Sequence, residues 1–103
     1  MENNNQNNQI EIELKDDVAE GIYSNLAIIS HSTTEFIVDF ARIMPGIPKG
    51  KVKSRIVLTP EHAKRLLAAL NDNIKKYEQQ FGLIKEEKNN AIPLTFTGPT
   101  AQA

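Results

Sequence analysis

The sequence of 103 residues contains no cysteine. This absence excludes disulfide bonds and zinc sites that are built on thiolates. The sequence also lacks a run of about eighteen apolar residues, the length that a membrane-spanning helix needs. A signal peptide has a basic segment followed by an apolar one, and the first residues of the chain do not have this pattern. We therefore expect a cytoplasmic protein that does not enter a membrane.

An excess of charge of one sign is also absent. The chain has 12 Lys and Arg against 13 Asp and Glu, and its net charge is −1. Proteins that bind nucleic acid through their overall field are strongly positive. The composition therefore provides no general attraction to nucleic acid, and only a local cluster of basic residues could bind it.

The two ends of the chain differ in composition from the middle. Residues 1–9 are dominated by Asn and Gln, and such a segment cannot bury enough surface to offset the entropy that ordering costs. Residues 83–103 are mostly polar and contain two prolines, as is typical of a mobile tail. The sequence thus predicts a disordered tail over 1–9, one domain over 10–82 and a mobile tail over 83–103. A domain of about seventy residues is only marginally stable as a monomer and commonly needs a partner.

Four segments of the middle region have the pattern of strands. Residues 10–15 alternate apolar and charged side chains, which indicates a strand with one face in water. Residues 23–30 and 35–44 are apolar on both faces, and residues 52–58 form the fourth strand. The intervening Pro-Gly-Ile-Pro-Lys-Gly contains two prolines and two glycines, which interrupt strand pairing and indicate a loop.

A long helix follows the fourth strand. Thr59 supplies an N-cap hydroxyl, Pro60 suits the first helical position, Glu61 places an acid in the first turn, and Gly82 suits the C-cap. Seven apolar residues recur at three- and four-residue spacing and form one stripe: Ala63, Leu66, Leu67, Leu70, Ile74, Tyr77 and Phe81. The order β-β-β-β-α predicts an α+β fold, in which a four-stranded antiparallel meander carries the C-terminal helix packed on one sheet face.

The stretch Ser-His-Ser-Thr-Thr-Glu over residues 30–35 contains the residue types of a catalytic triad. A triad needs side chains that converge in space near an oxyanion hole, whereas neighbours in a strand point to opposite faces. Ser and Thr hydroxyls also bond local backbone groups in turns. We therefore expect a hairpin turn with a half-exposed His31, no enzymatic activity and no cofactor. The only other histidine is His62, and two histidines without a third converging ligand predict no metal site.

Four basic residues recur at a spacing of two, which predicts that they share one side of the segment, opposite Val52 and Ile56. They are Lys49, Lys51, Lys53 and Arg55. A stripe of this kind can bind phosphates or an acidic partner. Lysines on an edge strand also prevent edge-to-edge aggregation, and no aromatic residue is interleaved to stack on bases. We favour this second role, so nucleic acid is not the expected partner.

The apolar character of both faces of the two middle strands predicts a homodimer joined through the sheet. One helix can cover only one face, and the other face would expose more apolar surface than monomers usually do. Grouped by alternation, one set is Leu26, Ile28, Phe36, Val38 and Phe40. The other set, which is assigned to the dimer face or the core together with Asp39, is Ala27, Ile29, Ile37, Ala41 and Ile43. Asp39 is expected to pair with a Lys or Arg of the second chain.

Several phrases of the chain together resemble an uncharacterised bacterial family of the Bacteroidetes type, named domain of unknown function 3467. These phrases are YSNLA, HSxxEF, DFxRxMPG and LTPxHAKRLL, and the resemblance covers roughly residues 10–82. It implies a small cytoplasmic protein with no assigned activity or catalytic residues. No functional site can be carried over from it.

The leading hypothesis is a non-enzymatic oligomeric interaction module, an adaptor or regulator that binds another protein. One alternative is a nucleic-acid-binding regulator that uses the basic strand. A second alternative follows from an analogy of architecture with the SecB-type export chaperones, which would make the protein a holdase for unfolded chains. The chain departs from that pattern because no second long helix is evident.

Overall fold

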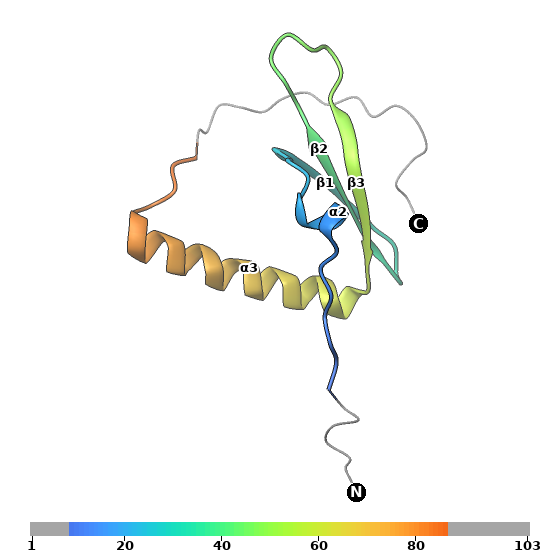
Figure 1. The fold of residues 1–103 in the computed structure, drawn as a ribbon, viewed down its shortest axis with the longest axis vertical. Helices are drawn as coiled ribbons and strands as arrows, with labels where there is room; N and C mark the ends of the chain where they lie inside the picture. Colours follow the sequence, from blue (N-terminus) through green and yellow to red (C-terminus); the bar gives the residue numbers. More distant parts are fainter. Residues whose placement is uncertain (1–8, 87–103) are drawn as a thin grey trace, which may run out of the picture.

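The computed structural model describes residues 9–86, and they form an α+β fold with an antiparallel sheet and a C-terminal helix, as predicted (Figure 1). Most of the predicted tails, residues 1–8 and 87–103, lie outside the described residues. The elements are α2 (Asp16–Ala19), β1 (Leu26–His31), β2 (Phe36–Arg42), β3 (Lys51–Leu58) and α3 (Pro60–Phe81).

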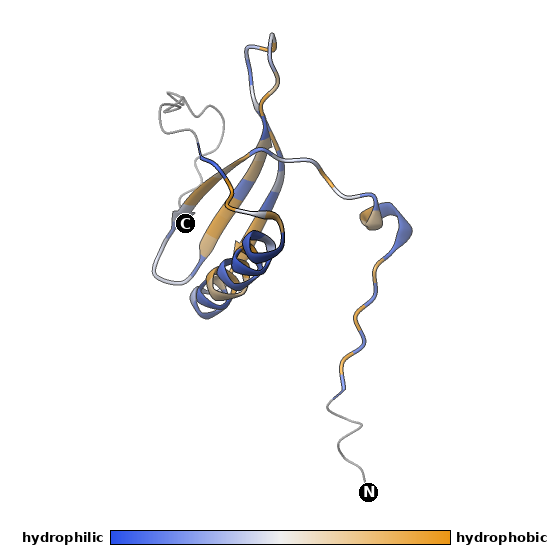
Figure 2. Ribbon diagram, turned by 90° about the vertical axis from the view of Figure 1, so that its left-hand side faces the viewer, coloured by the Kyte–Doolittle hydropathy of each residue, from blue (hydrophilic) through white to orange (hydrophobic). Residues whose placement is uncertain are grey.

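The predicted number of strands is wrong, because the described sheet has three strands in the order β1-β2-β3 and not four. Residues 10–15 are extended but do not join it. A one-turn helix, α2, follows them, and Gly21 then takes a φ of 78°, a value that favours glycine. These two features direct the segment away from β1, as Figure 2 shows. The alternation of apolar and charged residues over 10–15 therefore predicted the segment but not whether another strand pairs with it.

The register assigns each strand residue to one of two sheet faces, because directly opposite residues point to the same side. On β2, Phe36, Val38 and Phe40 lie on one face, and Ile37, Asp39 and Ala41 lie on the other. The Val38 face also carries Ala27, Ile29, His31, Ser54, Ile56 and Leu58. The Asp39 face also carries Leu26, Ile28, Ser30, Val52, Arg55 and Val57.

Two local devices fix the ends of this sheet. The Asn25 side chain accepts a hydrogen bond from the Ile43 N–H and donates one to the Ile43 carbonyl, both at 2.9 Å, so it extends the pairing of β1 with β2. In the loop after β2, the Ile47 N–H donates to the Met44 carbonyl at 3.2 Å, and Gly46 has a φ of 79°. Pro45 followed by a glycine of positive φ is the pattern of a type II turn. The motifs YSNLA and MPG thus have structural roles.

Helix α3 has the predicted ends. The Thr59 hydroxyl accepts a hydrogen bond from the His62 N–H at 3.1 Å, and Pro60 occupies the first turn. Gly82 ends the helix with a φ of 98°, and its N–H donates to the Glu78 carbonyl. Its ψ of 168° is extended, so the cap uses the conformational freedom of glycine but differs from the left-handed helical cap that is common at this position.

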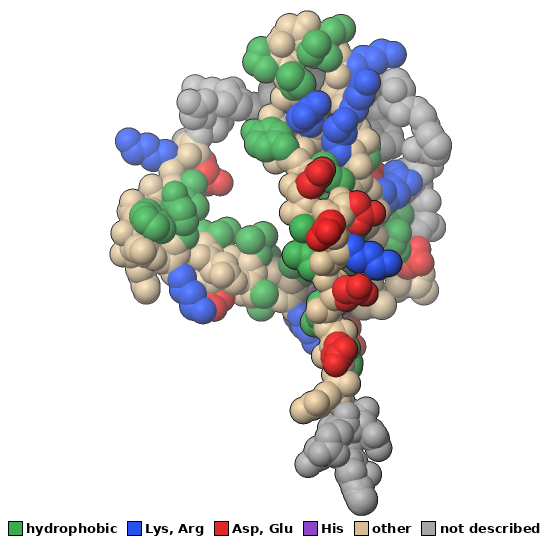
Figure 3. Space-filling view, viewed as in Figure 1, with side chains coloured by type: hydrophobic (Ala, Val, Ile, Leu, Met, Phe, Trp, Pro, Cys, Tyr) green, Lys and Arg blue, Asp and Glu red, His purple; other side chains and the backbone are tan. Residues whose placement is uncertain are grey.

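The prediction that the helix packs on one sheet face is wrong for the single chain. Helix α3 has no buried residue, and it extends from the end of the sheet with an open gap beside its apolar side (Figures 1 and 3). The physical reason is the connection between β3 and α3, which consists of Thr59 alone in an extended conformation. A connection of one extended residue limits how far the helix can turn back across the strands.

The core of the described residues is correspondingly small. Within residues 9–86 only Ile37, Val38 and Ala41 are buried apolar residues, and all three belong to the central strand β2. Asp39 is buried between Ile37 and Ala41. Three buried apolar side chains offset only a small part of the entropy that ordering such a domain costs. Most of the apolar surface of the fold is therefore exposed in the single chain.

Candidate functional site

The hydroxyl-rich stretch between β1 and β2 is a turn, as predicted. The Ser32 N–H donates to the Glu35 carbonyl at 2.9 Å, and the Ser32 hydroxyl accepts from the N–H groups of Thr34 and Glu35 at 3.2 and 3.3 Å. The ring of His31 stacks on Phe36 with the centroids 5.2 Å apart. The Ser32 hydroxyl thus bonds the backbone of the turn, and the His31 ring packs on Phe36 of the Val38 face.

An ion pair with two hydrogen bonds joins β2 to β3. The Nε and Nη2 atoms of Arg55 donate to the two carboxylate oxygens of Asp39 at 2.6 and 2.8 Å. The two residues are directly opposite in the register, so the β2–β3 pairing places the carboxylate and the guanidinium side by side. The Asp39 side chain has no accessible surface, and that of Arg55 is 38 % exposed. The Arg55 side chain therefore lies between the Asp39 carboxylate and solvent.

The electrostatics of this pair follow from its geometry. The hydrogen bonds from Arg55 lower the pKa of the Asp39 carboxyl below its usual value, burial opposes this change, and the charge of Arg55 reinforces it. The same bonds raise the pKa of Arg55. Both groups therefore stay charged at neutral pH. The expectation that Asp39 pairs with a second chain is wrong, because its partner belongs to the adjacent strand of the same chain.

The basic residues do not share one side of the chain, which corrects the alternation argument. The register shifts between Phe40 and Ala41, where Lys53 is the extra residue of a bulge in β3. Lys51 is opposite Arg42 and lies on the Val38 face, whereas Arg55 is opposite Asp39. Val52 and Ile56 are likewise on different faces. A bulge shifts the alternation of side chains by one residue. Residues at a spacing of two therefore need not lie on the same face when a bulge separates them.

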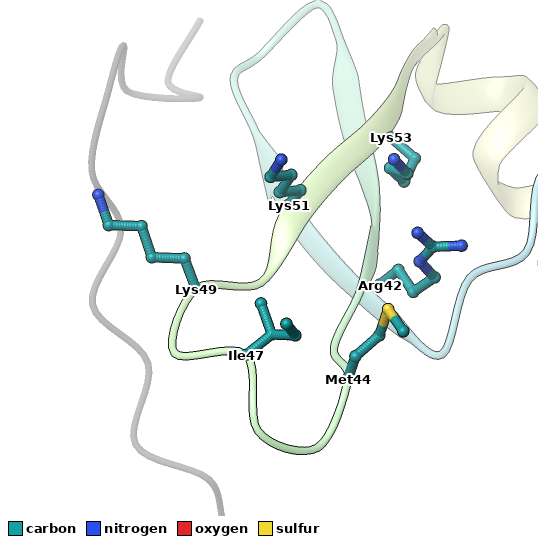
Figure 4. Close-up of a pocket in the computed structure, with 6 residues that line it drawn as sticks. All are labelled: Arg42, Met44, Ile47, Lys49, Lys51 and Lys53. Atoms are coloured by element: carbon teal, nitrogen blue, oxygen red, sulfur yellow. The ribbon is translucent and has the colours of Figure 1, made fainter.

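Three of the four predicted basic residues line a pocket of about 180 Å³ beside the loop between β2 and β3, and Figure 4 shows the end of the Lys49 side chain pointing away from the others. Its lining consists of Arg42, Met44, Ile47, Lys49, Lys51 and Lys53. Four cations around two apolar side chains favour an acidic ligand with an apolar part. Arg42 was missed by the sequence analysis because it lies across the loop from the lysines. Arg42 and Lys51 directly flank the loop over residues 43–50 and are paired across it. This placement at the two ends of the loop is the signal that could have revealed Arg42.

The predicted dimer-face set divides between the two sheet faces. Ile37, Asp39 and Ala41 are buried on the Asp39 face, whereas Ala27 and Ile29 are exposed on the Val38 face. Ile43 lies just beyond β2 and is half-buried. The two alternating sets were combined wrongly because the cross-strand register cannot be derived from the alternation within each strand.

Helix α3 carries an exposed apolar stripe along one side. Its six large side chains are 38 % to 68 % exposed: Leu66, Leu67, Leu70, Ile74, Tyr77 and Phe81. The rings of Tyr77 and Phe81 lie 4.9 Å apart and continue the stripe to the end of the helix. The opposite side of the helix carries i,i+4 ion pairs of Glu61 with Arg65 and Asp72 with Lys76. The helix is amphipathic, and none of the residues on its apolar side is buried within the described residues.

Metal binding and membrane crossing are two further possibilities for residues 9–86. No group of three or more His, Asp or Glu is placed to hold a metal ion there. No described helix is long and apolar enough to cross a membrane. Helix α3 has the length but not the composition, since its polar side carries two ion pairs.

Comparison with known proteins gives one match. The family model described as "Protein of unknown function (DUF3467)" matches residues 1–86 of the chain. No curated protein and no solved structure matches it. The match includes every described element and confirms the family to which the sequence phrases pointed, but it assigns no activity.

Proposed function

Since the chain belongs to the DUF3467 family, which is described only as being of unknown function, we propose a function from its surfaces. The protein is a non-enzymatic interaction module that acts as a homodimer, in the role of an adaptor or regulator. The observation that carries this proposal is the exposed apolar stripe of helix α3. A helix of 22 residues is about 33 Å long, which suits pairing with a second helix.

The energetics favour an interface larger than the stripe alone. Burying one large apolar side chain fully contributes about 1.5–3 kcal/mol. The six stripe residues are roughly half exposed, so covering them contributes about 1 kcal/mol each, or about 12 kcal/mol for two helices. Association costs about 4–15 kcal/mol. The helices alone thus roughly balance this cost, and a stable dimer also needs exposed apolar residues of one sheet face, such as Ile29 and Ile56 of the Val38 face.

A second copy of the chain is the partner that fits these surfaces most simply. Two-fold symmetry brings the same stripe from both chains together, so one amphipathic helix supplies both halves of the interface. The gap beside α3 in Figure 3 leaves space for an apolar element of another chain. The ion pairs on the other side of α3 stay in water in this arrangement.

Substitution of Leu70 by lysine tests the proposal. Leu70 is 54 % exposed in the single chain, so lysine disturbs little packing within its own chain but places a charge in a helix–helix interface. We expect the Leu70→Lys variant to raise the dimer dissociation constant about tenfold or more. The matched control is Asn71→Lys, which adds the same charge to the next residue of the helix.

Sedimentation equilibrium measures both variants, and circular dichroism shows whether they are folded. Equal dissociation constants for Leu70→Lys, the control and the native chain would contradict the proposed interface. Binding of a chemically unfolded model protein that is lost in Leu70→Lys, while the dimer persists, would instead favour a holdase that uses the same stripe.

A further inference from the structure

The segment before β1 is exposed over its whole length. We define residues 9–23 as the arm. Its six large apolar side chains are 61 % to 92 % exposed: Ile10, Ile12, Leu14, Val18, Ile22 and Tyr23. The arm leads away from the sheet of its own chain (Figure 2). So much exposed apolar surface in an ordered, extended segment indicates that the arm is completed by contact with another surface.

The first part of the arm has the alternating pattern of a strand and an extended course in Figure 2, but no described strand pairs with it. Residues 10–14 alternate apolar and acidic side chains. No described residue makes a backbone hydrogen bond with them. The sheet has two open edges among the described residues, the outer sides of β1 and β3. An open edge and an unpaired extended segment are complementary in their backbone groups.

The charges select the edge at β3. The arm carries five carboxylates and one lysine, whereas residues 42–55 carry five cations and no carboxylate. Strand β1, with the sequence Leu-Ala-Ile-Ile-Ser-His, has no acidic or basic residue other than its histidine. Arg42 and Lys51 are directly opposite each other, and Lys53 lines the same pocket. Like charges in opposite positions destabilise a sheet, and an acidic strand beside them removes this cost.

We propose that the arm of one copy adds to the outer edge of β3 of a second copy, with Glu11 and Glu13 beside Lys51 and Lys53. This inference rests on the proposed dimer and names the segment that each chain exchanges. Main-chain hydrogen bonds supply the attachment, and the charges supply the selectivity. The lysines of β3 thus discourage pairing with uncharged strands while they accept an acidic one.

Exchange between chains, rather than pairing within one chain, follows from the topology. Strand β3 is separated from the β1 edge by the whole sheet, and α2 with the turn at Gly21 directs residues 10–15 away from it. In a two-fold dimer both arms make the same contact, so two such strands are added for each dimer.

Charge reversal in two separate chains tests the exchange. The arm variant carries Glu11→Lys and Glu13→Lys, and the edge variant carries Lys51→Glu and Lys53→Glu. Each variant alone places like charges together, so its dimer dissociation constant should rise about tenfold or more. A mixture should form mainly heterodimers, because both arm–edge contacts in a heterodimer join opposite charges. Native mass spectrometry counts the three species. A chain with all four substitutions should again form homodimers.

The outcomes separate this inference from the proposed function. Homodimers of both variants that are as stable as the native dimer, or a statistical mixture of species, would overturn arm exchange and leave the dimer intact. A native chain that is monomeric would overturn both. Because the chain has no cysteine, a second test is available: Glu13→Cys in one chain and Lys53→Cys in another should form a disulfide-linked heterodimer on mild oxidation. Disulfides only between identical chains would contradict the exchange.

Discussion

The ion pair between Asp39 and Arg55 gives the most specific prediction about stability. Substituting Asp39 by asparagine keeps the volume but removes the charge that accepts two hydrogen bonds, at 2.6 and 2.8 Å. Hydrogen bonds to charged groups contribute about 1.5–3 kcal/mol each. Because Arg55 is 38 % exposed, water reaches the guanidinium and offsets part of this loss. We therefore expect Asp39→Asn to lower the free energy of unfolding by about 1–3 kcal/mol at pH 7.

The same pair predicts a dependence on pH. The pKa of Asp39 is lowered in the folded state, so its contribution to stability is fully present above the unfolded value of about 3.9. It is lost as the pH falls through the lower folded pKa, because the carboxylate then takes up a proton. The difference in stability between the native chain and Asp39→Asn should therefore shrink as the pH is lowered from 5 into this acidic range.

Urea denaturation at a fixed chain concentration measures the difference, since the stability of a dimer depends on concentration. The control is Glu61→Gln, which removes a carboxylate that also lies 2.6 Å from an arginine but has a side chain 75 % exposed. Exposed pairs contribute about 0–1 kcal/mol. An Asp39→Asn effect no larger than that of the control, or one that persists unchanged at low pH, would refute the account of this pair.

Two further predictions concern the loop between β2 and β3. Gly46 has a φ of 79°, so Gly46→Ala should lower the free energy of unfolding by about 1–2 kcal/mol; an unchanged urea midpoint would contradict the type II turn. The basic pocket is expected not to bind duplex DNA at physiological salt. A gel-shift titration with a log–log salt slope near −0.9 for each contact, abolished by charge reversal at Lys51 and Lys53, would contradict this expectation.

Features that depend on nearby residues could be predicted from the sequence. Thr59, Pro60 and Gly82 define the ends of α3, and each acts within about one turn of the helix. The turn after β1 depends on Ser32, whose hydroxyl bonds the backbone two and three residues later. Such contacts are encoded by adjacent residues, so the residue types themselves indicate the conformation.

Features that depend on register or on a distant partner could not be predicted. The bulge at Lys53 reverses the alternation of β3, and no residue type marks it. Pairing of Asp39 with Arg55 requires the register of β2 with β3, which alternation alone does not provide. For residues 10–15 the pattern specifies a strand but not the edge that it joins. The position of α3 beside the sheet, rather than across it, could have been predicted from the sequence. The connection to β3 is a single residue, which limits how far the helix can turn back.

The central claim, that the native chain is a homodimer, is tested most directly by its molar mass in solution. Light scattering at micromolar concentration, on protein that circular dichroism shows to be folded, should give twice the 11.5 kDa of one chain. Dilution should separate the chains and reduce the helix and sheet signals together, because the buried core of a single chain is small. A folded particle with the mass of one chain would contradict the account.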